Sequence, residues 1–394
     1  MPSRPPPSRF ESLPAAPFYI GLILSGIATV LLGPILPVIS TRWLLTDAQA
    51  GSLFTSQFTA SIIGAVLSSH YSRYSVVLGY VSIGLGLATL SFGTYGAALA
   101  GLWLMGLGIG GAVTATNLIF GTEYPERRGK LLTWTNFFWG VGAVAAPQLV
   151  AIAERHNALR FFLVCTATAT LLISAAFAPL LKRSERDRNT QSTTASGRIG
   201  VRIFVLFSVI LFLYVGSETA IAGWISTYTH RFENLSVARS SMVVSAFWLS
   251  IVAYRSFVPV LLKFMSELAV LLGGVCVAMG GLLLLLSPRS MTLTLIAVVL
   301  TGFGCAPIFP LSTSRLLGRV GRSRNTGWIF AICGSGGAVV PWLTGLLSER
   351  SGSLRTAFAV PLSAMAVILL CTLFENALPT SRTISIPDSS KQFY

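Results

Sequence analysis

The chain has 394 residues, of which 53% are hydrophobic and only 10% are charged. A soluble protein of this length carries a far more charged surface, so the composition excludes a soluble enzyme and favours a chain that lies in a bilayer. The formal net charge of +15 would suggest a nucleic-acid-binding protein in a soluble chain. Here the charges lie between long apolar runs, where they bear on membrane orientation and give no reason to expect nucleic acid as a partner.

Long apolar runs follow one another along the whole chain. A membrane-spanning helix needs about 20 apolar residues, and twelve runs meet that length. The runs cover residues 17–40, 49–69, 75–94, 97–121, 130–152, 158–181, 202–228, 239–262, 267–287, 291–313, 326–347 and 354–376. The sequence therefore predicts an all-α integral membrane protein with twelve transmembrane helices.

The longest interruption lies near the middle, where residues 182–200 are polar, charged and rich in Ser and Thr. Such a composition is typical of a linker. It predicts two six-helix bundles, at residues 17–181 and 201–376, joined by this linker. Residues 1–16 and 377–394 then form the two terminal tails.

Lys and Arg are distributed unevenly between the two sides that twelve spans define. One side holds nineteen of them and the other eight, with Arg255 inside a helix. Because basic residues are retained on the cytoplasmic side, both termini and the linker are predicted to be cytoplasmic. The expected location is the plasma membrane, that is, the inner membrane of a bacterium, in a multi-pass arrangement.

The two halves carry matching glycines and prolines. Glycines and a proline of the first half recur 196 or 194 residues later in the second half. This separation is close to half the chain and predicts a duplicated six-helix unit. The matched positions are Gly106 and Gly108 with Gly302 and Gly304, and Gly140, Gly142 and Pro147 with Gly334, Gly336 and Pro341.

Four local strings resemble those of one family. They are LTDAQAG at 45–51, PERRGK at 125–130 leading into NFFWG at 136–140, YVGSE at 214–218 and GFGCAPIFP at 302–310. Together with twelve spans in two halves, they resemble the major facilitator superfamily and, within it, the fucose-permease-like branch. The resemblance implies two pseudo-symmetric six-helix bundles, alternating access and transport of a sugar together with a proton.

Two positions depart from the family pattern. The loop after the second span carries Ser69 where the family has an aspartate, so the conformational latch of this loop, in which Arg73 lies, differs from the usual one. Sugar permeases of this branch can carry an acidic residue in the first span, whereas the stretch from Ile20 to Ser40 has none. Coupling to protons therefore has to be argued from this chain's own residues.

Glu218 is the acidic residue that lies well inside a predicted span; the others lie in loops or near helix ends. A carboxylate is costly in hydrocarbon, so it is expected to face a cavity and to belong to a pathway or relay. It shares a helix face with Tyr214, Trp224 and Tyr228. We therefore expect Glu218 to be the proton-coupling residue, the alternative being a structural hydrogen bond.

Arg255 in the eighth span is either an interfacial anchor or a gate residue. Measured from the cytoplasmic ends of their helices at 1.5 Å per residue, Arg255 lies at a depth of about 12 Å and Glu218 at about 24 Å. These depths predict no direct ion pair between them. Asn117 and Arg73 are further candidates for a conformational role.

Polar and aromatic stripes lie on several spans; on the eighth, Ser245, Trp248 and Arg255 share one face. Amides pair with hydroxyl groups and aromatic faces cover the apolar side of a sugar ring, whereas hydrogen bonds between helices are the structural alternative for the amides. The expected substrate-binding residues are Gln57, Asn136, Trp139, Tyr214, Trp224, Tyr228 and Trp248.

The three histidines, His70, His156 and His230, lie apart in loops or at helix ends, so neither a metal site nor a cofactor is expected. The preferred interpretation is a monomeric secondary active transporter in the lipid bilayer, moving a sugar or similar neutral polar molecule, with protons as the second partner. The alternatives are an exporter of drugs or lipids with the same fold and a transport-inactive membrane sensor.

Overall fold

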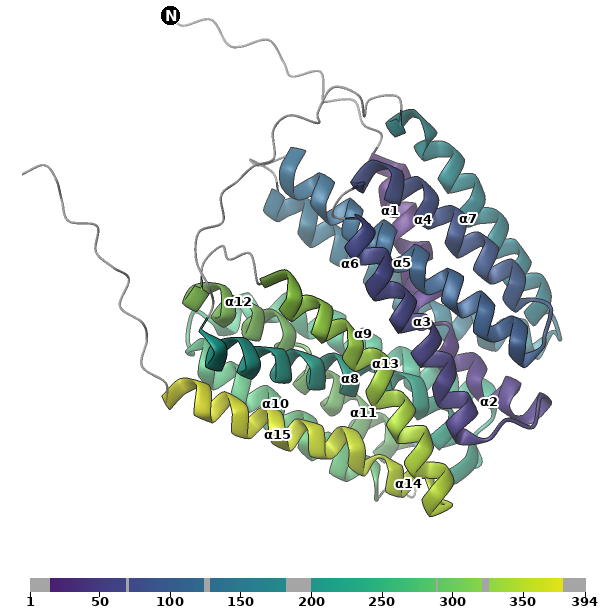
Figure 1. Cartoon of the computed structure of the whole chain (residues 1–394). Helices are drawn as coiled ribbons and strands as arrows, with labels where there is room; N and C mark the ends of the chain where they lie inside the picture. The colour runs from purple at the N-terminus through teal and green to yellow at the C-terminus, as the bar shows by residue number, and fades with distance from the viewer. Residues whose placement is uncertain are drawn as a thin grey trace, which may run out of the picture.

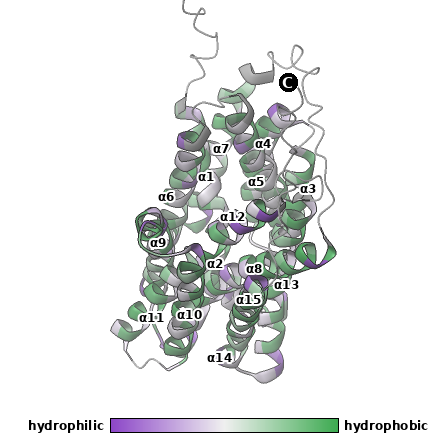
Figure 2. Ribbon diagram, turned by 90° about the vertical axis from the view of Figure 1, so that its left-hand side faces the viewer, coloured by the Kyte–Doolittle hydropathy of each residue, from purple (hydrophilic) through white to green (hydrophobic). Residues whose placement is uncertain are grey.

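The computed structural model describes residues 15–68, 71–123, 128–181, 200–287, 290–320 and 326–377, and this part of the chain is almost entirely helical. Within it, twelve helical segments are long and apolar enough to cross a membrane, which confirms the predicted number of spans. Figure 2 shows hydrophobic residues along the lengths of these helices. Most of the predicted linker and tails lie outside the described residues.

The helices form two groups, one above the other in Figure 1, and each group holds six of the twelve spans. The N-terminal bundle contains α1 (Ala15–Val30), α2 (Leu32–Arg42), α3 (Asp47–Ser68), α4 (Ser72–Leu90), α5 (Tyr95–Glu123), α6 (Arg128–Arg155) and α7 (Leu159–Leu181). The C-terminal bundle contains α8 (Val201–Phe232), α9 (Val237–Leu261), α10 (Glu267–Leu285), α11 (Met291–Cys305), α12 (Ile308–Val320), α13 (Thr326–Ser351), α14 (Leu354–Ala357) and α15 (Ala359–Ala377).

Three spans consist of two consecutive helices. The first span is α1 followed by α2, the tenth is α11 followed by α12, and the last is α14 followed by α15. Each break lies near a proline, namely Pro34, Pro307 and Pro361. Proline has no N–H for the carbonyl four residues earlier and its ring clashes with that turn, so the helix bends or breaks there.

The matched glycines occupy equivalent places in the two bundles. A β-carbon at Gly142 of α6 would collide with the carbonyl oxygen of Ile23 on α1, and one at Gly336 of α13 would collide with that of Phe212 on α8. The fifth span thus packs on the first as the eleventh packs on the seventh. Only glycine lets the backbones approach so closely, and the predicted repeat is confirmed.

The fourth and tenth spans show the same correspondence. Gly106 on α5 lies against the Gln57 carbonyl of α3, and Gly302 on α11 lies against the Phe247 carbonyl of α9. Small residues at matched positions therefore set equivalent helix approaches in both halves.

The two bundles meet along α3 with α13, α6 with α9, and α2 with α8. We call the end where α7 stops and α8 begins the linker end, and the end where α8 turns into α9 the loop end. The α3–α13 contacts include Gly51 with Trp342 and a hydrogen bond of 2.9 Å from Thr55 Oγ1 to the Ala338 carbonyl. Both lie between the loop end and the middle of these helices.

Candidate functional site

Three side chains of the C-terminal bundle form a charged cluster, which we define as Tyr214, Glu218 and Arg255. The Tyr214 hydroxyl donates to Glu218 Oε1 at 2.7 Å, and Arg255 Nη2 lies 3.3 Å from the same oxygen. The Glu218 and Arg255 side chains are 15% and 32% exposed, respectively. A charge in the middle of a membrane protein is stabilised by such a partner and marks a functional position.

A break in the tenth span helps to hold Arg255. Its Nε donates to the Ala306 carbonyl at 3.3 Å. In a continuous helix this carbonyl would accept from residue 310, but that residue is Pro310 and has no N–H. The proline thus leaves a backbone oxygen for the guanidinium, and the break between α11 and α12 becomes part of the charged cluster.

The prediction that Glu218 and Arg255 do not pair directly is wrong. It compared depths from the linker ends of α8 and α9, which do not lie level. Measured from the loop end, where α8 and α9 are joined by a short turn, Glu218 lies about 21 Å from Phe232 and Arg255 about 27 Å from Val237. A long arginine side chain spans the remaining difference of about 6 Å.

The predicted polar stripe of α9 faces the other bundle. Trp248 meets Trp139 of α6 edge to face, with ring centroids 5.5 Å apart, and we call these residues the tryptophan pair. One turn nearer the loop end, Ser245 Oγ donates to the Val144 carbonyl at 2.9 Å and accepts from Gln148 Nε2 at 3.1 Å. Gln148 was not among the predicted site residues, although its amide lies three turns along α6 from Asn136.

Several buried polar atoms have no hydrogen-bond partner among the described residues, and two of them belong to predicted substrate-binding residues. These two are Gln57 Oε1 and the indole Nε1 of Trp248, both buried. The other end of the Gln57 amide donates to the carbonyls of Ala28 and Thr29 at 3.3 and 3.4 Å, respectively. A buried polar atom without a partner calls for a water or a ligand, so each atom is a candidate contact for a water or a hydroxylated solute.

Asn136 and the two other predicted aromatic residues lie in different surroundings. Asn136 is exposed and its Nδ2 donates to the Leu132 carbonyl of its own helix at 2.9 Å. Trp224 is fully buried and donates from Nε1 to the Pro341 carbonyl of α13 at 2.9 Å. The bond to Pro341 uses the single N–H of Trp224, whereas Asn136 keeps a second N–H and its Oδ1 for a substrate.

Tyr228 lies inside the C-terminal bundle. Its hydroxyl donates to the Leu285 carbonyl of α10 at 3.0 Å, and its ring stacks on Phe232. The residue is fully buried. The face of α8 that was predicted to be one continuous stripe therefore has two surroundings. Near Tyr214 it belongs to the charged cluster, and near Tyr228 it lies in the core of the bundle.

The two remaining conformational candidates are Asn117 and Arg73. Asn117 is half-buried on α5, towards the linker end, and Arg73 is half-buried in the first turn of α4. Ser69, where the family pattern departs, lies outside the described residues. The structure therefore does not bring either candidate into the charged cluster or the tryptophan pair.

A contact between the bundles at the loop end was missed by the sequence analysis. Asp47, the first residue of α3, accepts from Arg231 Nη1 at 2.7 Å and from Ser348 Oγ at 2.6 Å, and Glu349 Oε2 accepts from the Ala48 N–H at 2.8 Å. We call these four side chains, Asp47, Arg231, Ser348 and Glu349, the loop-end contact. The Glu349 carboxylate also lies at the N-terminus of α3, where a negative charge is favoured.

The linker end of the C-terminal bundle carries a second buried charge group. Glu375 of α15 is 1% exposed and pairs with both Arg315 and Arg319 of α12. Arg319 Nη2 also donates to the Glu375 carbonyl at 2.8 Å. These bonds join two helices of one bundle, so the group fastens the C-terminal bundle internally and does not bridge the interface.

No group of three or more His, Cys, Asp or Glu side chains suited to a metal ion is present in the part of the chain that the structure describes. The site itself offers one carboxylate, one guanidinium, a phenol, amides and indoles. These groups can exchange a proton and bind a neutral solute.

Comparison with known proteins identifies the family. A family model described as Major Facilitator Superfamily matches residues 18–325. The "Putative glucose/galactose transporter" of Helicobacter pylori is 23% identical over 392 residues, which cover 89% of this chain and 93% of that protein.

Two solved structures have the same fold. The fucose:proton symporter of E. coli matches with a TM-score of 0.62 and 18% identity, covering 94% of this chain and 99% of that one. The nucleoside transporter NupG matches with a TM-score of 0.76 and 13% identity, covering 91% of this chain and 99% of that one. At these identities the two structures support the fold and carry no residue assignments.

Proposed function

Since the chain belongs to the Major Facilitator Superfamily and is a membrane transporter, we propose that it moves a sugar or a similar neutral polyol together with a proton, by alternating access. The observation that carries the proposal lies on α9. One face of this helix holds Trp248 of the tryptophan pair and, about two turns away, Arg255 of the charged cluster. A solute site and an ion site are thus placed on the same rigid element.

The sugar part of the proposal rests on the tryptophan pair. Aromatic faces cover the apolar side of a sugar ring, and the unpartnered atoms Trp248 Nε1 and Gln57 Oε1 supply one donor and one acceptor. The exposed Asn136 would add an amide on α6. The names of the Helicobacter pylori protein and of the E. coli symporter favour a sugar among the neutral solutes.

The proton part rests on Glu218. When Glu218 takes up a proton, Arg255 loses its ionic partner and keeps only neutral acceptors, among them the Ala306 carbonyl and the Tyr214 hydroxyl. The guanidinium charge is then less well stabilised, which favours a movement of α9. Because α9 carries Trp248 against α6, the protonation state of Glu218 is coupled to the contact between the bundles.

The proposed topology places the linker end in the cytoplasm, as the Lys and Arg distribution predicts. The contacts between the bundles that we describe lie from the loop end to just beyond the middle of α3 and α13. This arrangement supports a state that is closed on the outer side and open towards the cytoplasm. Bundle boundaries at residues 17–181 and 201–376, a plasma-membrane location and a monomeric protein complete the proposal.

Uptake into liposomes tests the function. The purified protein is reconstituted and given an inward proton gradient with a panel of labelled monosaccharides, polyols and nucleosides. We expect at least one monosaccharide to accumulate above its external concentration, and a protonophore to abolish the accumulation. Transport of amphipathic dyes without any sugar would favour the exporter, and the absence of any counterflow would favour the inactive sensor.

A further inference from the structure

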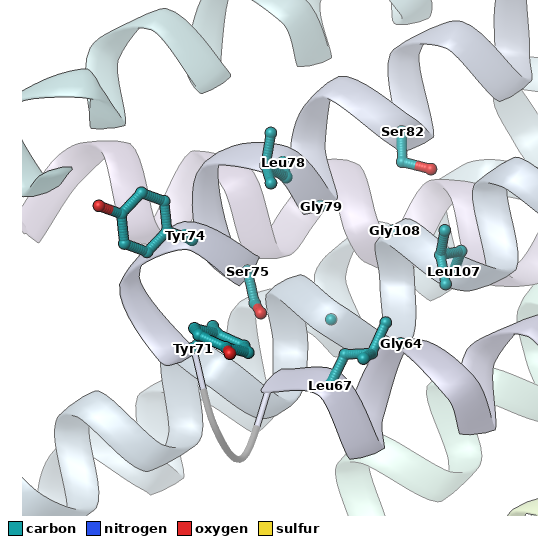
Figure 3. Close-up of a pocket in the computed structure, with 11 residues that line it drawn as sticks. Gly64, Leu67, Tyr71, Tyr74, Ser75, Leu78, Gly79, Ser82, Leu107 and Gly108 are labelled. Carbon is teal, nitrogen blue, oxygen red and sulfur yellow. The ribbon is translucent and has the colours of Figure 1, made fainter.

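A lateral groove of about 520 Å³ lies between α3, α4 and α5 of the N-terminal bundle, and Figure 3 shows the residues that line it. Its walls are leucine and tyrosine side chains and its floor is rich in glycine. The lining residues are Gly64, Leu67, Tyr71, Tyr74, Ser75, Leu78, Gly79, Ser82, Leu107, Gly108 and Gly111. No residue of the charged cluster or the tryptophan pair contributes to it.

The groove exists because α3 and α4 both pack on α5 but hardly on each other. Gly64 of α3 lies against the Leu107 carbonyl, and Gly79 of α4 lies against Gly108. Between them, Gly111 has no side chain, and a β-carbon there would still be 3.6 Å from the nearest atom, the Ser75 carbonyl oxygen. The seam between the two helices is therefore left unfilled.

The groove faces away from the other bundle. Ile62 of α3 contacts Gly334 of α13, and Leu67 lies about 140° around the helix from Ile62. Leu67 and Leu78 are 51% and 61% exposed, respectively. Apolar side chains exposed at this depth of a transmembrane bundle face lipid, so the groove lies outside the solute pathway.

The dimensions of the groove match one leaflet. Its α4 wall extends from Tyr71 to Ser82, a length of about 16 Å, whereas the hydrocarbon core of a bilayer is about 30 Å thick. The wall begins at the linker end, at the residue that precedes α4. An acyl chain that entered there would run along the groove to about the middle of the membrane.

The mouth carries groups suited to a lipid headgroup. Tyr71 and Tyr74 are 59% and 45% exposed, and tyrosines favour the interfacial region of a membrane. Arg73 adds a positive charge at the same level, on the side that holds nineteen of the basic residues. We propose that the lateral groove binds one acyl chain of an anionic phospholipid from the linker-end leaflet.

Filling the floor of the groove tests the proposal. Gly111→Leu places a side chain in the seam, where a β-carbon already makes ordinary contacts. Gly280→Leu on α10 is the control, because nothing lies within 4 Å of a β-carbon there. Both variants and the wild type are purified, delipidated, supplied with phosphatidylglycerol or phosphatidylcholine and analysed by native mass spectrometry. We expect the wild type and Gly280→Leu each to retain one phosphatidylglycerol molecule more than Gly111→Leu does. The wild type and Gly280→Leu should retain phosphatidylcholine less well than phosphatidylglycerol.

A second measurement does not depend on the folding of a variant. A phospholipid with a photoreactive acyl chain is cross-linked to the wild-type protein before and after washing with excess detergent. The fraction of labelling that remains when the wash precedes cross-linking should be several-fold higher at Leu78 than at Leu172 of α7. Leu172 is similarly exposed, at 67%. Equal loss at both positions, or equal lipid retention by wild type and Gly111→Leu, would overturn the proposal; neither result depends on transport.

Discussion

The two bundles share a scaffold but differ in what they bury. Equivalent glycines place the fifth and eleventh spans against the first and seventh by the same backbone approach. The C-terminal bundle, however, encloses the ion pair of Glu218 and Arg255, whereas the corresponding helices of the N-terminal bundle present neutral amides such as Gln57. The close packing of helices is thus repeated in both bundles, whereas the charged pair is present in one of them. Packing depends on small residues, while a proton site needs a single ionisable side chain.

Removing the charge of Glu218 should have the largest effect on this asymmetry. Glu218→Gln keeps the size of the side chain but cannot exchange a proton, so we expect accumulation driven by a pH gradient to be abolished while exchange of substrate between two compartments continues. Transport in liposomes measures both. Glu267→Gln, a carboxylate at the start of α10, is the control and should behave as wild type.

If Glu218→Gln still concentrates substrate under the gradient, Glu218 is structural. Coupling would then lie elsewhere, or the protein would be a facilitator. The difference between the bundles would in that case concern stability alone.

The stability of the C-terminal bundle should depend on keeping Glu218 and Arg255 paired. Glu218→Gln leaves a largely buried guanidinium without its partner and should cost about 2 to 3 kcal/mol, below the range for a fully buried pair because Arg255 is partly exposed. The double variant with Arg255→Gln should recover part of that loss. Thermal unfolding in detergent measures all three variants, and a double variant as unstable as the sum of the singles would show that the pair is not coupled.

The tryptophan pair tests the proposed binding of a neutral solute, in contrast to the charged pair. Trp248→Ala removes the ring that contacts Trp139 and should weaken sugar binding by about 1 to 3 kcal/mol, or about 5- to 150-fold in Kd. Fluorescence quenching or calorimetry measures the affinity. Trp103→Ala on α5, a tryptophan 40% exposed and outside the pair, should leave the affinity unchanged.

The loop-end contact offers a smaller test of how the bundles separate. Asp47→Asn removes the ion pair with Arg231, whose side chain is 42% exposed, and should shift the equilibrium towards the outward-open state by about 1 kcal/mol, or about fivefold. Accessibility of a cysteine at Thr55 from the outer side measures the shift. Glu154→Gln breaks the Arg42 pair within one bundle and should leave accessibility unchanged.

The smallest expected effect is at Tyr228. Tyr228→Phe removes the hydrogen bond to Leu285 and should lower stability by about 1 kcal/mol. Because the side chain lies inside the C-terminal bundle, sugar affinity should not change. A loss of affinity without a loss of stability would return Tyr228 to the substrate site, where the helical stripe of α8 had placed it.

Periodicity predicted the direction of side chains better than their partners. On α9, Ser245 and Trp248 of the predicted stripe contact α6 of the other bundle, and Arg255 pairs with Glu218 of α8. The same reasoning on α8 grouped Tyr214 with Tyr228, which lie about 21 Å apart along the helix and contact different neighbours. A helical stripe gives an angle about the axis, and the neighbour that fills that angle changes along the length of the helix.

The sequence by itself determined the twelve spans, the repeat and the presence of a carboxylate inside a span, because hydrophobic length and composition are local properties. The tertiary structure decided that Glu218 pairs with Arg255, that Pro310 leaves the Ala306 carbonyl for it, and that Asp47 reaches Arg231 across the bundles. These contacts depend on the axial offset of helices that are neighbours in space. That offset is set by close packing at glycines and by the turns at the loop end, and residue spacing along one helix does not contain it.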